Sequence, residues 1–405
     1  MTRKLKFITT SLFVTGWIFI FQTSFAHADE TVQQSTTLIV PDPIPSDTST
    51  VTISVSDVQN KIDAASTALS DSASSNGQSL IQIIQSNTNS DTLKGIGDDA
   101  AVIKMGDTCL LLSTDMLLEG VHFDLRYVPL RHLGYKSIAV NVSDIAAMNG
   151  KPGQVLIGLG LSNRFSIEAV DELYAGMRAA CKDYGVDLVG GDTTSSAAGL
   201  VISVSVTGTC DPQKVVYRSG AQSGDIICVT GDLGAAYMGL QVLEREKAVF
   251  LENPEAQPDL EPYGYLVGRQ LKPDARMDII HDFAENNLVP TSMIDVSDGL
   301  ASELFHLVKQ SGCGVKIFED KIPMDHRMYD TAIEFKMDPS TCALNGGEDY
   351  ELLFTIRQSD LEKVKNHPDI HMIGHMHSDP TQNVLITKSG NQIPLKAQGW
   401  NHFSQ

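Results

Sequence analysis

The chain has 405 residues, of which 42% are hydrophobic and 20% are charged, so it is long enough for two domains with their own cores. Asp and Glu total 50 against 30 Lys and Arg, which gives a formal net charge of −20. This charge disfavours nonspecific binding to nucleic acid or to anionic lipid. Most of the carboxylates can simply keep the surface soluble, but an acidic protein that handles phosphates needs cations.

The first 28 residues have the pattern of a signal peptide. Lys4 and Lys6 precede an apolar stretch over residues 7–25, and an A-x-A pattern follows at 26–28. An uncleaved membrane anchor and a wrongly assigned start codon are the alternatives, and membrane contact is expected only for the anchor. Residues 29–80 are rich in Ser, Thr, Asp and Gln and poor in aromatic residues, which predicts a low-complexity disordered tether.

From about residue 80, apolar strands alternate with amphipathic helices and glycines separate them, which predicts a mixed α/β architecture. The polar, turn-forming segment 216–225 divides this region into an N-terminal domain, 81–215, and a C-terminal domain, 216–405. Six scattered cysteines without a C-x-x-C pair predict buried free thiols and no zinc site. The predicted strands are 110–114, 200–207, 226–230 and 293–296, and the predicted helices are 135–148, 167–184, one from 235, and 300–309.

Aspartates recur at glycine-rich turns and strand ends. Loops at strand ends are where sites form in α/β folds, and carboxylate and hydroxyl oxygens are the ligands that Mg²⁺ takes. A single Asp next to Gly is explained by turn formation alone, but four or five such motifs in one chain favour a metal site. The chain contains no P-loop, so ATP use would depend on metal-bridged phosphates. These aspartates are Asp98, Asp115, Asp192, Asp295 and Asp298.

Four further residues attract attention for their surroundings. Asp144 is the carboxylate of a predicted helix that is apolar nearly all round, so it needs a partner, which a metal would supply. Arg218 lies in the interdomain segment, where a guanidinium could clamp a nucleotide phosphate. His122 and Glu348 lie at turns beside apolar segments. Considered alone, Arg218 is typical of a surface residue and His122 of a structural one.

Seven segments together closely resemble the thiamine-monophosphate kinase branch of the aminoimidazole-ribonucleotide-synthetase-like superfamily. They occur in order over about residues 94–403, and their combined specificity is high. The segments are GIGDDAAVI from 95, STDMLLEGVHFDL from 113, YKSIAVNVSDIAAMNG from 135, LVGGDTTSS from 188, RSGAQSGD from 218, IDVSDGLASEL from 294 and NGGEDYELLF from 345.

The resemblance implies a two-domain α/β fold of the AIR-synthase type, whose N-terminal domains pair into a β-barrel across a homodimer and whose C-terminal domain is α/β. It implies direct, Mg²⁺-assisted transfer of the γ-phosphoryl group of ATP to thiamine monophosphate, which needs no covalent or general-base residue. By position it makes metal ligands of Asp98, Ser113, Thr114, Asp115, Asp144, Asp192, Asp295 and Asp298. It assigns nucleotide binding to Gly191, Asp192, Arg218 and Ser297, and thiamine monophosphate binding to His122, Glu348 and Trp400.

Two alternatives stay open at this point. A sister enzyme of the superfamily, such as the purine-pathway cyclase, selenophosphate synthetase or a hydrogenase maturation factor, would share the fold and the use of ATP. An exported, noncatalytic nucleotide-binding protein would explain the leader-like segment. The implied activity favours the cytoplasm, where ATP is abundant, and this conflicts with the predicted signal peptide.

Overall fold

The computed structural model describes residues 35–38, 51–54, 89–197, 199–255 and 257–397. The predicted leader, 1–28, lies outside the described residues, as does most of 29–80. Within the latter segment, β1 (Ser35–Leu38) pairs antiparallel with β2 (Val51–Ser54) in a compact unit, Met1–Asp71. All other described elements belong to a second compact unit, Ser72–Gln405. None of the described helices has the length and apolar character needed to cross a bilayer.

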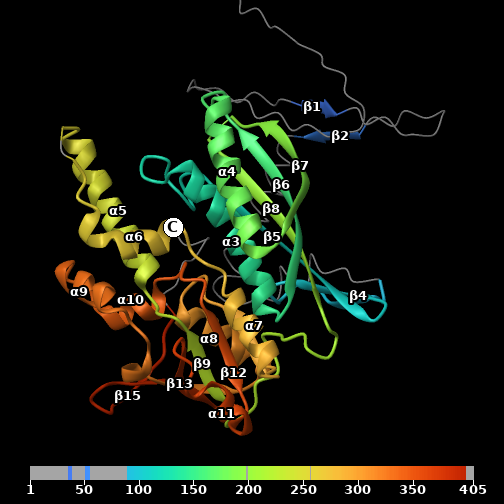
Figure 1. Cartoon of the computed structure of the whole chain (residues 1–405), viewed down its shortest axis with the longest axis vertical. Coiled ribbons are helices and arrows are strands. Elements are labelled where there is room, and N and C mark those ends of the chain that lie inside the picture. Colours follow the sequence, from blue (N-terminus) through green and yellow to red (C-terminus); the bar gives the residue numbers. More distant parts are fainter. Residues whose placement is uncertain (1–34, 39–50, 55–88, 198, 256, 398–405) are drawn as a thin grey trace, which may run out of the picture. The chain divides into compact units, whose positions relative to one another are not determined.

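The first sheet of the second unit has six strands in the order β3-β4-β5-β8-β6-β7. Only the β6–β7 pair is parallel, and the remaining pairs in this sheet are antiparallel. Two helices lie against it (Figure 1), with α3 contacting β5, β6 and β8 and α4 contacting β7. The elements are β3 (Thr92–Lys94), β4 (Ala101–Met105), β5 (Thr108–Leu118), α3 (Leu130–Ala147), β6 (Lys151–Leu161), α4 (Ile167–Tyr184), β7 (Asp187–Ser195) and β8 (Val201–Cys210).

Strand alternation gives this sheet one buried and one exposed face. On β5, Leu111 and Leu117 are buried beneath the helices, whereas Leu112 and Met116 are 40% and 54% exposed on the other face. Leu156 on β6 and Val189 on β7 are also about half exposed. The described part of the chain therefore leaves these apolar side chains exposed on a sheet face without a covering layer.

The second sheet has seven strands in the order β10-β12-β9-β13-β11-β14-β15, with a parallel pair between β11 and β14. Its helices are α5 (Ala235–Glu252), α6 (Gly264–Leu271), α7 (Met277–Glu285), α8 (Leu300–Ser311), α9 (His326–Glu334), α10 (Pro339–Asn345) and α11 (Leu361–Val364), with short 3₁₀ turns at Glu261–Tyr263, Glu319–Lys321 and Gln358–Asp360. Its strands are β9 (Ile226–Thr230), β10 (Ser292–Asp295), β11 (Gly314–Phe318), β12 (Leu352–Ile356), β13 (Ile370–His377), β14 (Asn383–Ile386) and β15 (Gln392–Pro394).

Both faces of the second sheet are buried at strands β9, β10 and β12. On β12, Phe354 packs edge-on against Phe283 of α7, with ring centroids 5.0 Å apart. Leu353 points to the opposite face, where it joins a core that includes Leu304 and Leu307 of α8. Because α7 and the first sheet share one hydrophobic core, the two sheets belong to a single packed unit.

The element predictions are confirmed by the structure. Helix α4 has the predicted bounds, with the Ser166 hydroxyl accepting the Ala169 N–H at its start and Gly185 at φ +65° ending it. Strand β9 also has the predicted bounds, while β5 and β8 extend beyond theirs. All six cysteines are buried and free, as predicted. The connection from β8 of the first sheet to β9 of the second contains the segment 216–225, and the division into two domains there stays a prediction.

Helices α3 and α4 cross at two glycines, Gly134 on α3 and Gly176 on α4. A Cβ at Gly176 would lie 1.9 Å from the Arg131 carbonyl oxygen, whereas a Cβ at Gly268 on α6 would meet nothing within 4 Å. We therefore expect Gly176→Ala to lower the free energy of unfolding by about 1–3 kcal/mol, because the helices must separate. Gly268→Ala, the control, should raise it by about 0.5–1 kcal/mol through helix propensity. Urea denaturation measures both, and an unchanged Gly176→Ala variant would contradict this account of the crossing.

Candidate active site

Three aspartates from distant parts of the sequence meet where the two sheets approach each other. Asp99 precedes β4, Asp144 lies in the last turn of α3, and Asp295 ends β10. One carboxylate oxygen of each lies within 4.8 Å of the others, and Asp99 and Asp295 are buried. Such a group of oxygen donors is suited to a divalent cation.

Neighbouring hydroxyl and amide groups fix these carboxylates in place. The Ser113 hydroxyl donates to Asp144 Oδ2 at 2.5 Å, and the Ser143 hydroxyl donates to Asp295 Oδ2 at 2.6 Å. Asn141, one turn before Asp144, accepts the backbone N–H of Asp115 at 3.1 Å. Strand β5 thus presents Ser113 and Asp115 to helix α3, and the cluster is ordered by hydrogen bonds from both elements.

The negative charge of the clustered carboxylates exceeds the positive charge that Arg218 places beside them. Burial raises the pKa of Asp99 to about 7, with repulsion from other aspartates adding to the effect and Arg218 opposing it. Burial raises the pKa of Asp295 to about 6. Burial and three neighbouring aspartates raise the pKa of Asp144 well above its usual range. A bound cation would relieve this cost directly.

Mg²⁺ fits the donor set. The facing side chains offer carboxylate and hydroxyl oxygens, which Mg²⁺ prefers, with no thiol or imidazole among the three clustered residues. Asp99 Oδ2 is buried and accepts no hydrogen bond within the described part of the chain. A buried carboxylate oxygen in that state requires an explanation, and a metal ion would complete its coordination.

The predicted residue Asp98 lies beside the cluster and contacts basic and backbone groups. Its Oδ1 accepts the Arg218 backbone N–H at 2.9 Å, and its Oδ2 pairs with the Lys94 ammonium at 3.1 Å. The Arg218 guanidinium donates to Asp99 at 2.5 Å. The structure thus brings Asp99 into the carboxylate cluster, although the sequence analysis did not assign it a role. Its position next to Asp98 in the same glycine-rich turn was the available signal.

The loop after β10 carries two more predicted residues, Ser297 and Asp298. Buried Glu303 organises this loop: its Oε1 accepts the Asp298 backbone N–H at 3.0 Å and the Ser297 hydroxyl at 3.4 Å. Burial raises the pKa of Glu303 to about 8. The sequence analysis did not single out Glu303.

Three predicted residues lie apart from the cluster. The Thr114 hydroxyl donates to the Val204 carbonyl oxygen at 3.0 Å, and strand alternation places Thr114 on the opposite sheet face from its neighbours Ser113 and Asp115. Gly191 and Asp192 lie on the edge strand β7, where Asp192 is exposed. Only glycine fits at 191, because a Cβ there would lie 1.9 Å from a backbone carbonyl oxygen of β6.

Lys136 and Gln270 lie between two residues predicted to bind the phosphate acceptor, His122 and Glu348. Glu348 pairs with the buried Lys136 ammonium at 3.1 Å, and its other oxygen accepts the Gln270 amide at 2.5 Å. Lys136 and Gln270 also line a small cavity together with His122. Lys136 was recognisable as the lone cation in an apolar helical segment. Trp400, the third predicted residue, lies outside the described residues.

Known proteins match the chain over most of its length. A thiamine-monophosphate kinase of Buchnera aphidicola from Schizaphis graminum is 36% identical over 318 residues, covering 77% of this chain and 93% of that protein. The Aquifex aeolicus kinase is 34% identical over 325 residues, covering 80% and 97%. The chain belongs to the thiamine-monophosphate kinase family.

Structural comparison agrees with this membership of the thiamine-monophosphate kinase family. The family model for the N-terminal domain of AIR synthase related proteins matches residues 97–210. The solved structure of AaThiL complexed with AMPPCP and TMP aligns with a TM-score of 0.66 at 32% identity, covering 80% of this chain and 94% of that one. The predicted family, the AIR-synthase-like α/β fold and the kinase class of enzyme are confirmed.

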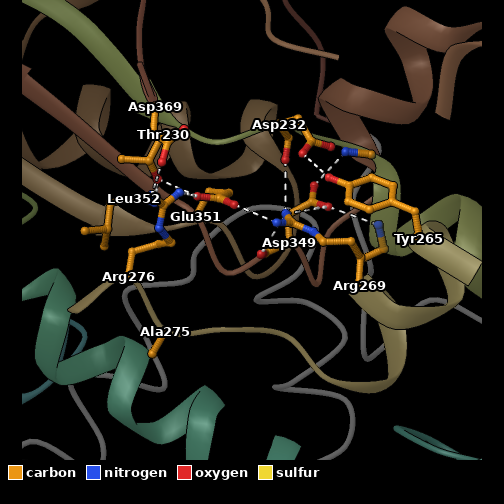
Figure 2. A network of polar contacts seen from close by, with 12 residues as sticks. Thr230, Asp232, Tyr265, Arg269, Ala275, Arg276, Asp349, Glu351, Leu352 and Asp369 are labelled. Atoms are coloured by element: carbon orange, nitrogen blue, oxygen red, sulfur yellow. Dashed lines mark hydrogen bonds and ion pairs between the residues drawn. The ribbon is translucent and has the colours of Figure 1, made fainter. Parts of the chain in front are cut away.

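In this member of the kinase family, a buried ionic network holds the turn that carries Glu348 (Figure 2). Glu348 and Tyr350 adopt left-handed backbone conformations, with φ of +58° and +53°, which non-glycine residues rarely adopt. The two residues that alternate with them, Asp349 and Glu351, are buried and anchor the turn.

Asp349 and Glu351 contact residues of the C-terminal half of the chain. Asp349 accepts the backbone N–H groups of Gly234 and Ala236 at the start of α5. Glu351 pairs with Arg269 at 2.8 Å and Arg276 at 2.6 Å (Figure 2). Removing one partner of such a buried pair is costly, so the network fixes the turn despite its unfavourable dihedral angles.

Metal removal should expose the repulsion in the carboxylate cluster. In EDTA at pH 8 we expect Asp144→Asn to raise the free energy of unfolding by about 1 kcal/mol or more, because one buried charge becomes neutral while Ser113 keeps an acceptor. Exposed Asp107→Asn is the matched control and should change nothing. Urea denaturation measures both, and a destabilised Asp144→Asn variant would contradict the repulsion.

The pH dependence has a definite sign. Because the pKa values of Asp99 and Asp295 are raised to about 7 and about 6, the folded state binds more protons than the unfolded chain between about pH 4 and 7. In EDTA, stability should therefore fall as pH rises through this range, and Mg²⁺ should reduce the fall. Thermal melts with and without Mg²⁺ measure the difference.

Proposed function

We propose that this protein transfers the γ-phosphoryl group of ATP to the phosphate of thiamine monophosphate, giving ADP and thiamine diphosphate. One observation carries the proposal: helix α3 brings Asp144 to the carboxylate cluster and Lys136 to Glu348. Eight residues separate Lys136 from Asp144, which is roughly 12 Å along a helix. A phosphate-binding metal cluster and an acceptor site at that spacing suit phosphoryl transfer. The co-binding of AMPPCP and TMP by AaThiL supports the same pair of substrates.

Asp99, Asp144 and Asp295 would hold Mg²⁺ together with the predicted ligands Asp98, Ser113, Asp115 and Asp298. Thr114 and Asp192 lie apart from this cluster, so their role as ligands stays a prediction. When bound, Mg²⁺ would neutralise charge on the transferring phosphate. Arg218, with Gly191, Asp192 and Ser297, would bind the nucleotide. The acceptor phosphate is already ionised, so alignment and charge neutralisation suffice and no general base is required.

His122 and Glu348 would bind thiamine monophosphate from two sides, and Trp400 would stack on it. His122 Nδ1 accepts the Leu118 backbone N–H at 3.0 Å, so in the neutral ring the proton lies on Nε2. The Glu348 carboxylate suits the cationic thiamine moiety. We propose the cytoplasm as the place of action, since ATP is available there.

A second copy of the chain is proposed to cover the exposed sheet face. Leu112 and Met116 on β5, Leu156 on β6 and Val189 on β7 are between 40% and 58% exposed. Several large apolar side chains exposed on one sheet face favour its burial in an interface. Pairing two such sheets in a homodimer would form the β-barrel that the family resemblance implies.

Product formation tests the function. Purified full-length protein with ATP, Mg²⁺ and thiamine monophosphate should yield thiamine diphosphate and ADP in equal amounts, and EDTA should abolish both. Asp115→Asn should lower kcat at least about 100-fold, or about 2.7 kcal/mol, with the melting temperature retained, because Asp115 lies beside the cluster. Exposed Asp107→Asn is the control. Binding of ATP without any thiamine diphosphate would overturn the choice of acceptor.

The dimer is tested by light scattering after gel filtration. The double variant Met116→Asp, Leu156→Asp should elute as a monomer, because charges on the apolar face oppose its burial. Ile333→Asp, at a residue that is 55% exposed on α9, is the matched control and should keep the wild-type mass. A dimeric double variant would place the interface elsewhere.

A further inference from the structure

Gln270 occupies a position between the acceptor residues that the function proposed above does not use. It is the second-last residue of helix α6, directly before Leu271, and is 6% exposed. Its side-chain amide nitrogen donates to Glu348 Oε2 at 2.5 Å, and its backbone carbonyl oxygen accepts the Lys136 ammonium at 3.1 Å. Lys136 pairs with the other oxygen of Glu348, so the three residues form a closed triangle of contacts.

The orientation of the Gln270 amide is fixed by its partner. An ionised carboxylate can only accept hydrogen bonds, so the amide nitrogen must face Glu348 and the amide oxygen must point away from it. That oxygen, Oε1, is buried and accepts no hydrogen bond from the described residues. A buried polar atom without a hydrogen bond is unfavourable, which favours a ligand that satisfies it.

A cavity lies next to this side chain. Its volume is about 10 Å³, and Gln270, Lys136, His122 and Tyr127 are among the residues that line it. This is the space of roughly one water molecule, which also admits an amino group but not a ring. The cavity therefore suits the projecting polar group of a larger molecule bound at Glu348.

Thiamine monophosphate offers one group of the required kind. Its only N–H donor is the exocyclic amino group of the pyrimidine ring, and its hydroxyl is esterified to phosphate. Resting on the proposed function, we propose that Gln270 is a specificity-determining residue, whose Oε1 accepts a hydrogen bond from this amino group. The neighbouring Glu348 carboxylate is placed to accept the second N–H. Lys136 is a positioning residue that holds both acceptors.

The consequence is discrimination against an analogue without the amino group. In oxythiamine monophosphate a carbonyl oxygen replaces the amino group, so two acceptors would face each other at Gln270. Wild-type kcat/KM should be at least about 100-fold lower for this analogue, since a site built to hydrogen-bond a substrate rejects a ligand that cannot do so. A merely structural glutamine predicts that removing its acceptor leaves this preference unchanged, because Glu348 alone would supply it.

The test compares both substrates in wild type and Gln270→Met, which keeps the length of the side chain without its acceptor. The kcat/KM for thiamine monophosphate should fall about 10- to 100-fold, and the preference over the analogue should shrink at least about 10-fold, with Glu348 retaining the rest. The KM for ATP should stay within about twofold. Gln392→Met, at an exposed residue on β15, is the control and should retain the wild-type preference.

The outcomes separate this inference from the function beneath it. An active wild type that uses both substrates equally, or a Gln270→Met variant that keeps the full preference, overturns the role of Gln270 alone. A wild type that makes no thiamine diphosphate overturns the proposed function as well. If Gln270→Met does not fold, calorimetric titration of the wild type with each phosphate decides, because equal affinities contradict the inference.

Discussion

Mutual repulsion among three aspartates is the constraint on which the rest of this structure depends. At 4.8 Å and an effective dielectric constant of about 20, each pair of full charges would repel by roughly 3 kcal/mol. Arg218 offsets part of this through Asp99, and two serine hydroxyls stabilise Asp144 and Asp295. The repulsion that these groups do not offset would favour the binding of a cation, and of a phosphate bound to that cation.

Helix α3 carries Asp144 into this cluster and is buried on nearly every side. It packs on the first sheet and α4, and it also contacts β10, α6 and α7 of the C-terminal half. Its inward-facing polar side chains therefore need specific partners, and four of them find partners outside the helix: Lys136 at Glu348, Asn141 at β5, Ser143 at Asp295 and Asp144 at Ser113. One helix thus joins both halves of the site.

Local pattern was enough to predict most elements and part of the site. Glycine stops and strand alternation gave α4 and β9 their bounds, and an isolated carboxylate in an apolar helix pointed to Asp144. Strand alternation would also have separated Thr114 from Asp115. The contacts of Glu348 with Lys136 and Gln270 were beyond such reasoning, since they join strands and helices distant in sequence. Only the folded chain shows that Asp99 has an unsatisfied oxygen.

Backbone hydrogen bonds join the carboxylate cluster to the turn that carries Glu348. Asp295 pairs with Leu352 across β10 and β12. The carboxylate cluster and the turn that carries Glu348 therefore lie at the same end of this strand pair. The turn then stays bonded to the loop beyond Asp295: Tyr350 N–H donates to the Val296 carbonyl oxygen at 2.9 Å, and Glu348 N–H donates to that of Ser297 at 2.7 Å. Because these bonds are short and Arg269 and Arg276 anchor the turn, Glu348 cannot move without moving the loop after β10 that carries Ser297. Acceptor and donor phosphates would thus be aligned by the sheet itself, which is the alignment that transfer without a general base requires.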